Sequence, residues 1–288
     1  MMVSTAGYAL NDTAIKAVGN TMPLAQLLFL RGVVTTVLML LAVRWIGAIR
    51  LDLPGREWGL ILLRSLADLG ASTFFVMALL NMPLANVTAI LQALPLTVAL
   101  AAALVLGEPL GWRRLSAILI GFGGVMLIIR PGAAGFDVWS LWGLGAVGFI
   151  TLRDLAARRL APTTPSSTVA FAASFVIMIA AGVATWLAPW TPVDLRAAGL
   201  VGLAGIFLVA GYLASVATMR SGEIGFVAPF RYTGLVWALI LGFVIFGDWP
   251  DALTLTGAGI VVATGLFTLY RARKLTLRRR ETLPSAKG

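Results

Sequence analysis

Long stretches without a charged side chain alternate with short polar segments along the whole chain. Residues 69–107 are 39 consecutive positions without Asp, Glu, Lys or Arg, and residues 160–193 and 197–219 also contain no charged side chain. An ionised side chain at the centre of a bilayer costs about 3 kcal/mol, so these stretches predict transmembrane helices. Each break contains Pro, Gly or Asp. We expect ten spans, each near the ~20 residues that cross the hydrocarbon, at about 2–18, 24–43, 58–80, 83–106, 112–130, 137–160, 165–188, 195–220, 223–246 and 252–271.

The composition excludes a water-soluble globule. Hydrophobic residues make up 59% of the chain and charged residues 12%, whereas soluble domains carry about 25% charged residues. The chain has no cysteine and no histidine, so we expect neither a metal site nor a cofactor. The net charge of +10 does not indicate nucleic acid, because no separate basic domain exists to bind it. The composition predicts an all-α polytopic membrane protein.

Lysine and arginine predict the orientation of the bundle, since cytoplasmic loops carry the excess. Fifteen of them fall on the side that holds both termini and two, Arg130 and Arg196, on the other. We therefore expect both termini in the cytoplasm of a bacterial-type cell, with the bundle in the inner membrane. Seven of the fifteen follow Tyr270, and this basic tail is suited to anionic lipid headgroups.

The two halves of the chain align with each other at an offset of 140 to 141 residues. Gly107-Glu108 falls on Gly247-Asp248, and residues 85–89 fall on residues 225–229. Two halves of five spans have opposite orientations in the membrane, because five is odd. Inverted repeats around a midplane site are typical of secondary transporters. We therefore expect a first repeat at 1–132, a second at 133–271 and a cytoplasmic tail at 272–288.

Several segments are similar to one transporter family. Residues 89–96, 106–110 and 120–125 resemble the fourth and fifth helices of EamA-type members of the drug/metabolite transporter superfamily. Residues 11–16, 29–32, 63–64 and 228–232 resemble its subgroup of S-adenosylmethionine or riboflavin uptake carriers. The resemblance implies ten helices in two inverted repeats around a central cavity, with alternating access and no ATP. It also implies a longer first helix than the ten residues ahead of Asn11 allow, so either the native N-terminus is longer or this helix is short.

Charged side chains inside the spans are candidates for function, because lipid does not tolerate them unpaired. In the outer half, Asp12 and Arg31 lie at similar depth and are expected to form an ion pair. Lys16 follows Asp12 by one helical turn on the same face. With Asn11, these residues are the candidates for an intramembrane ion pair or for coupling.

The inner half holds the candidate substrate-binding residues. Arg64 and Asp68 are four positions apart, Arg231 enters from the same side, and Asp154 approaches with Arg153. Tyr232 and Gln92 complete the set. Over both halves five positive charges face three negative ones, and this surplus favours a substrate with a carboxylate or another anionic group. Arg153 either joins this layer or extends to the cytoplasmic surface.

These features predict a secondary transporter for a small organic metabolite, such as an amino acid, rather than an enzyme. A broad-specificity exporter of drugs or amino acids is the alternative among carriers. An intramembrane protease is disfavoured because each aspartate has a basic neighbour, and a channel because no ring of like charges is present. The pattern leaves open the substrate, the direction of flux, proton coupling, and whether the carrier is a monomer or a homodimer.

Overall fold

The computed structural model describes residues 1–47, 49–108, 110–130, 137–187, 190–221 and 228–282. All regular elements in these ranges are helical, and eight stretches there are long and apolar enough to cross a membrane. Two further expected spans correspond to α1 (Met2–Val18), with 17 residues, and to α7 (Trp139–Arg158). The chain is an all-α polytopic membrane protein, and the number of ten spans stays a prediction.

The remaining helices follow the expected spans closely. The first half continues with α2 (Leu24–Ile46), α3 (Gly55–Asn81), α4 (Leu84–Leu91), α5 (Leu94–Leu106) and α6 (Trp112–Ile129). The second half continues with α8 (Ser166–Ala184), η1 (Thr185–Leu187), α9 (Leu195–Ser221), η2 (Ala228–Tyr232), α11 (Thr233–Leu241), η3 (Gly242–Phe246) and α12 (Ala252–Thr282). The start of the ninth expected span, at residues 223–227, lies outside the described residues. The structure differs at the other end of the chain, where α12 continues through most of the expected tail.

Proline and glycine mark many of the helix ends. The residue before the first turn is Pro23 in α2, Pro54 in α3, Pro83 in α4 and Pro165 in α8. Proline suits this position because its missing N–H has no partner there in any case. Gly107 and Gly247 follow α5 and η3 with φ of 68° and 69°, a conformation that glycine adopts without strain. The sequence alignment of these two glycines therefore corresponds to the same backbone turn.

The fourth and ninth expected spans are both interrupted. A turn at Gln92 separates α4 from α5, and Pro95 lies in the first turn of α5. In the second half, the 3₁₀ turn η2 contains Pro229 and ends at Tyr232, where α11 begins. Irregular backbone inside a membrane is tolerated where protein or a cavity surrounds it. These breaks place polar backbone groups in the interior of the bundle.

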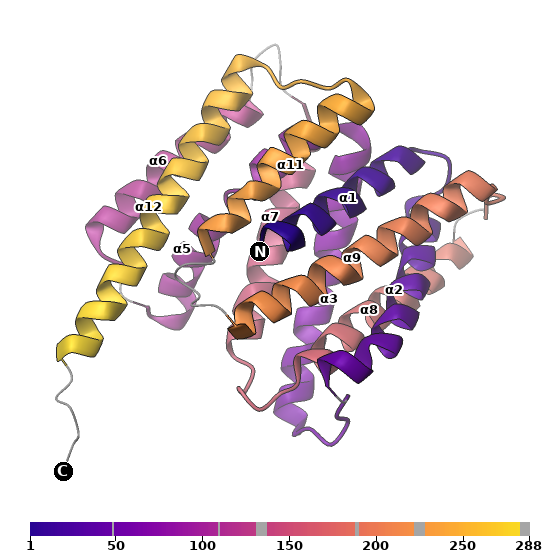
Figure 1. Ribbon diagram of the computed structural model, residues 1–288, viewed down its shortest axis with the longest axis horizontal. Helices are drawn as coiled ribbons and strands as arrows, with labels where there is room; N and C mark the ends of the chain where they lie inside the picture. Colours follow the sequence, from indigo (N-terminus) through magenta and orange to yellow (C-terminus); the bar gives the residue numbers. More distant parts are fainter. Residues whose placement is uncertain (48, 109, 131–136, 188–189, 222–227, 283–288) are drawn as a thin grey trace.

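The helices of the two halves pack in the same pattern. α3 packs on α7, and the equivalent helices α9 and α1 pack on each other. α3 also contacts α8, just as α9 contacts α2. α6 lies along α12 and α2 along α8, so these helices contact their own counterparts (Figure 1). A twofold relation between the halves produces this pattern, while the repeat boundaries at 132 and 271 stay a prediction.

Glycines bring α6 and α12 into backbone contact. A Cβ atom at Gly257 would lie 2.5 Å from the carbonyl oxygen of Gly124, and one at Gly124 would lie 2.8 Å from that of Gly257. Small residues allow such close approach between helices in membranes. Gly123 and Gly259, in contrast, have open space where a Cβ would be. Only some of the glycines in these two helices therefore serve close packing.

Candidate functional site

Two arginines and two aspartates form an ion cluster between α3 and α7. Arg64 Nη1 lies 3.4 Å from Asp68 Oδ2. Arg153 bridges two carboxylates, with Nη1 3.1 Å from Asp68 Oδ1 and Nη2 3.0 Å from Asp154 Oδ1. None of the four side chains is more than 28% exposed. The structure thus brings Arg64, Asp68 and Asp154 together, and it places Arg153 inside the bundle rather than at the cytoplasmic surface.

The charges of this cluster cancel, so the surplus positive charge lies elsewhere. Arg231, in η2, has an exposed side chain and forms no ion pair with any residue that the structure describes. A guanidinium without a carboxylate partner is available to an anionic ligand.

Gln92 and Tyr232 contact each other where the two interrupted helices meet. Gln92 Nε2 donates a hydrogen bond of 3.3 Å to the carbonyl oxygen of Tyr232. The two residues are 140 positions apart, so they are equivalent under the repeat, and equivalent residues can touch only at the axis that relates the halves. The Tyr232 hydroxyl is buried, has no hydrogen-bond partner among the described residues and lies against Gly265, where a Cβ would overlap it. The contact between the two halves therefore contains polar groups.

The expected ion pair between Asp12 and Arg31 is not formed. Asn11 Nδ2 instead donates a hydrogen bond of 2.8 Å to Asp12 Oδ1. Arg31 is buried and forms an ion pair with neither Asp12 nor Asp68. Similar depth along two helices does not fix which way each side chain points, so the two expected partners need not meet.

Lys16 contacts the end of α3 rather than Asp12. Its Nζ donates hydrogen bonds of 3.3 Å to the carbonyl oxygen of Leu79 and 2.5 Å to that of Met82. The ammonium also lies 5.4 Å from the centre of the Phe246 ring. Cations stabilise the carbonyl end of a helix, where backbone acceptors lack partners. Lys16 therefore joins α1, α3 and η3 at one end of the bundle.

A related contact joins the equivalent elements at the opposite ends of the helices. Arg158 Nη1, at the end of α7, lies 2.9 Å from Glu108 Oε1, just after α5. The equivalent residues, within two positions, are Lys16 and Asp248, which form no ion pair. The two halves therefore carry matching acid–base pairs, and only the Glu108–Arg158 pair is in direct contact.

Tyr8 belongs to the inner group, although its sequence context did not single it out. Its ring packs against Gly211 of α9, and Thr5, one turn before it, contacts Thr233, two positions after Arg231. A signal was present in the repeat, because Tyr8 is aligned with Phe149 at an offset of 141. A polar replacement at an otherwise apolar repeat position is the feature that could have identified it.

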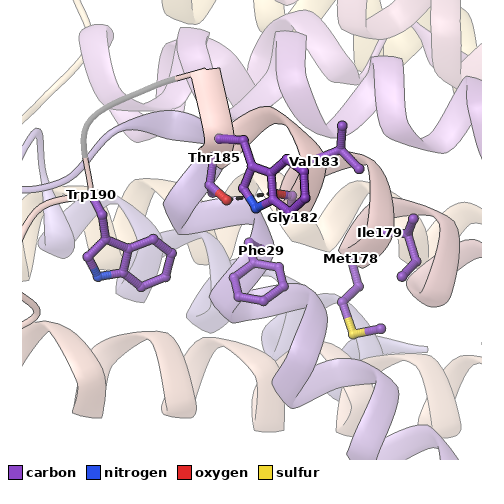
Figure 2. Close-up of a pocket in the computed structure, with 8 residues that line it drawn as sticks. Phe29, Met178, Ile179, Gly182, Val183, Thr185 and Trp190 are labelled. Carbon is purple, nitrogen blue, oxygen red and sulfur yellow. Dashed lines mark hydrogen bonds between the residues drawn. The ribbon is translucent and has the colours of Figure 1, made fainter.

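An apolar groove of about 550 Å³ lies apart from these charges. Figure 2 shows Phe29 of α2 beside Trp190, with aliphatic side chains of α8 along the other wall. The rings of Phe29 and Trp190 are 6.2 Å apart, and Trp186 is 91% exposed. The groove has no charged lining residue, so it does not suit an anionic group. Elsewhere in the described ranges, no three acidic side chains come together as a metal site requires.

Comparison with known proteins agrees with this architecture. Residues 1–130 match the model of the EamA-like transporter family. An S-adenosylmethionine uptake transporter of Rickettsia prowazekii (strain Madrid E) is 24% identical over 95% of this chain and 92% of its own length. The pseudopaline exporter CntI of Pseudomonas aeruginosa (strain UCBPP-PA14) is 25% identical over 93% of both chains. A riboflavin transporter of Vibrio cholerae serotype O1 is 27% identical over 81% of this chain and 78% of its own.

The fold also has a counterpart among solved structures. One crystal structure superimposes with a TM-score of 0.67, covers 95% of this chain and 97% of its own, and shares 21% sequence identity. The structure is an apolar helical bundle with charged side chains inside it, and the relatives are named as metabolite transporters. These findings indicate a multi-pass membrane transporter of small metabolites, not an enzyme. Residues 1–130 therefore resemble the EamA-like transporter family, and relatives named as metabolite transporters align with most of the chain.

Proposed function

We propose that this chain is a secondary carrier that moves a small organic metabolite bearing an anionic group across the inner membrane. The observation that carries the proposal is Arg231, whose guanidinium forms no ion pair within the described residues while Arg64 and Arg153 are neutralised by aspartates. Arginine suits carboxylates and phosphates because its planar fork can donate two parallel hydrogen bonds. The anionic group of the substrate would supply the missing partner.

Alternating access is the second part of the proposal. Two inverted halves can exchange conformations, so that a contact present at one end of the bundle in one state appears at the other end in the next. The Glu108–Arg158 pair is in contact, while its equivalent pair, Asp248 and Lys16, is not. This difference between matched pairs supports a carrier that alternates between two asymmetric states. We place both termini in the cytoplasm on the basis of the lysine and arginine distribution.

The relatives leave the substrate and the direction open. Their names give three different metabolites, and they include both an uptake transporter and an exporter. Counterflow in liposomes decides both questions, because a carrier exchanges labelled for unlabelled substrate and saturates. The probes are S-adenosylmethionine, riboflavin, amino acids and organic acids, each tested from both sides of the membrane.

Arg231→Gln tests the role of the unpaired guanidinium. A hydrogen bond to a charged group contributes about 1.5–3 kcal/mol, so we expect KM to rise about 10- to 150-fold with an unchanged unfolding temperature. Arg231→Lys should also be impaired, since a point charge does not reproduce the planar fork. Arg196→Gln, at an exposed position in α9, is the matched control.

The double mutants separate binding from folding. If Arg231 balanced Asp68 or Asp154, then adding Asp68→Asn or Asp154→Asn to Arg231→Gln would restore transport. The structure contains no such pair, so we expect no recovery. Wild-type transport by Arg231→Gln alone, or full recovery in a double mutant, would refute the substrate role of Arg231.

A further inference from the structure

One face of α1 carries a stripe of polar residues into the bundle. Thr5, Tyr8, Asp12 and Lys16 are spaced by three or four positions, which places them on one side of the helix. The two ends of the stripe have partners on other helices. Thr5 Oγ1 lies 2.8 Å from Thr233 Oγ1 of α11, and Lys16 contacts α3. The stripe therefore faces the interior, and Tyr8 lies within it.

The ring of Tyr8 has a packing role that its repeat counterpart fills without a hydroxyl. A Cβ atom at Gly211 of α9 would lie 3.2 Å from Tyr8 Cδ1. At the equivalent positions, 141 residues away, a Cβ at Gly70 of α3 would lie 2.6 Å from Phe149 Cδ1. Both halves thus pack an aromatic ring on a glycine between the same pair of helices. Since Phe149 does this as phenylalanine, the hydroxyl of Tyr8 is not needed for the packing.

The surroundings of the hydroxyl indicate its use. Thr233, whose hydroxyl contacts Thr5 one turn before Tyr8, follows Arg231 of η2 by two positions, so η2 and α1 meet beside Tyr8. Arg153 is bound to two aspartates, whereas Arg231 has no carboxylate partner among the residues that the structure describes. An anion held by Arg231 would therefore lie close to a phenolic O–H, and such donors form strong hydrogen bonds to ionised oxygens.

We propose that Tyr8 is a specificity-determining residue that donates a hydrogen bond to the same anionic group that Arg231 binds. This inference rests on the proposed function and adds to it a second contact, from the first half of the chain, to a group otherwise held by the second half. The ligand class is a carboxylate or a phosphate, both of which present more than one ionised oxygen. A metabolite without such a group gains nothing from the hydroxyl.

Tyr8→Phe in the full chain is the test, since it removes one oxygen atom and keeps the ring on Gly211. The readouts are counterflow in liposomes and thermal unfolding in detergent, with labelled S-adenosylmethionine as the carboxylate probe, riboflavin 5′-phosphate as the phosphate probe and riboflavin as the probe with neither group. We expect KM for a transported anionic probe to rise about tenfold, with kcat and Tm close to wild type. Tyr270→Phe, at an exposed position in α12, is the matched control and should change nothing.

The remaining outcomes separate this inference from the proposed function. An unchanged KM in Tyr8→Phe, or a KM for riboflavin raised as much as that for an anionic probe, overturns the role of Tyr8 even if Arg231→Gln abolishes transport. If both KM and Tm change, the double mutant Tyr8→Phe with Arg231→Gln decides: effects that do not add support one shared group, and additive effects overturn it. If wild-type protein carries no anionic probe, or carries one equally well after Arg231→Gln, the proposed function itself fails.

Discussion

Gly257→Ala tests the backbone contact between α6 and α12. The new Cβ would lie 2.5 Å from the Gly124 oxygen and 2.8 Å from a side-chain carbon of Ile128. Ordinary contact between such atoms requires about 3.5 Å, so the two helices must separate by roughly 1 Å at this point. Overpacking of this kind costs about 1–3 kcal/mol. Alanine also raises helix propensity by about 1 kcal/mol relative to glycine, which partly hides the clash.

Gly259→Ala separates these two effects. Gly259 is two positions away on the same helix and has open space where a Cβ would be, so the variant gains propensity without a clash. We therefore expect Gly257→Ala to be less stable than Gly259→Ala by about 1–3 kcal/mol. The measurement is reversible unfolding of both purified variants and wild type in detergent micelles. Equal stability of the two variants would refute the contact, and with it the argument that small residues hold α6 and α12 together.

Two further predictions concern the loops. The hydrogen bond from Arg130 lowers the pKa of Asp251, just ahead of α12, to about 2. The stabilisation from this ion pair is therefore complete above pH ~4 and is lost as the pH falls towards 2. Asp251→Asn should lower the Tm at pH 7 by a small amount, since the carboxylate is 55% exposed and such pairs contribute at most about 1 kcal/mol. The difference in Tm from wild type should vanish near pH 2, and a difference that stays constant with pH would contradict this. Reporter fusions after Lys274 should be cytoplasmic and fusions within residues 131–136 periplasmic, and the same side for both would exclude ten spans in inverted repeats.

The positions of the helices were largely predictable from the sequence. The cost of placing charge in lipid defines charge-free spans, and proline or glycine marks where a helix can begin or end, as at Pro23 and Gly107. The repeat was visible for the same reason, because the turn at Gly107 and its copy at Gly247 need the same backbone conformation. These signals are local, so they do not depend on how the helices are rotated against one another.

The partners of the charged side chains were less predictable. Similar depth along their helices suggested that Asp12 and Arg31 form an ion pair, but Asp12 accepts a hydrogen bond from Asn11 instead. Lysine and arginine side chains are longer than one helical turn, so their partners depend on how each helix is rotated about its own axis. Lys16 illustrates this, since its partners are backbone carbonyls of α3, which have no signature in side-chain chemistry. The grouping of Arg64 with Asp68 was predicted correctly because both lie on one helix, where the spacing of four positions fixes their proximity.

The contact between Gln92 and Tyr232 has a consequence for how such a chain can evolve. Two identical subunits meeting across a twofold axis would have to place the same side chain on both sides of it. Covalent fusion of the halves removes this restriction, so an amide faces a phenol-bearing residue here, and the position that holds Asp12 in one half holds Arg153 in the other. A duplicated and fused scaffold can thus keep a symmetric helical framework while the polar groups near its axis become asymmetric. A ligand with distinct head and tail groups would then have a single preferred orientation against them.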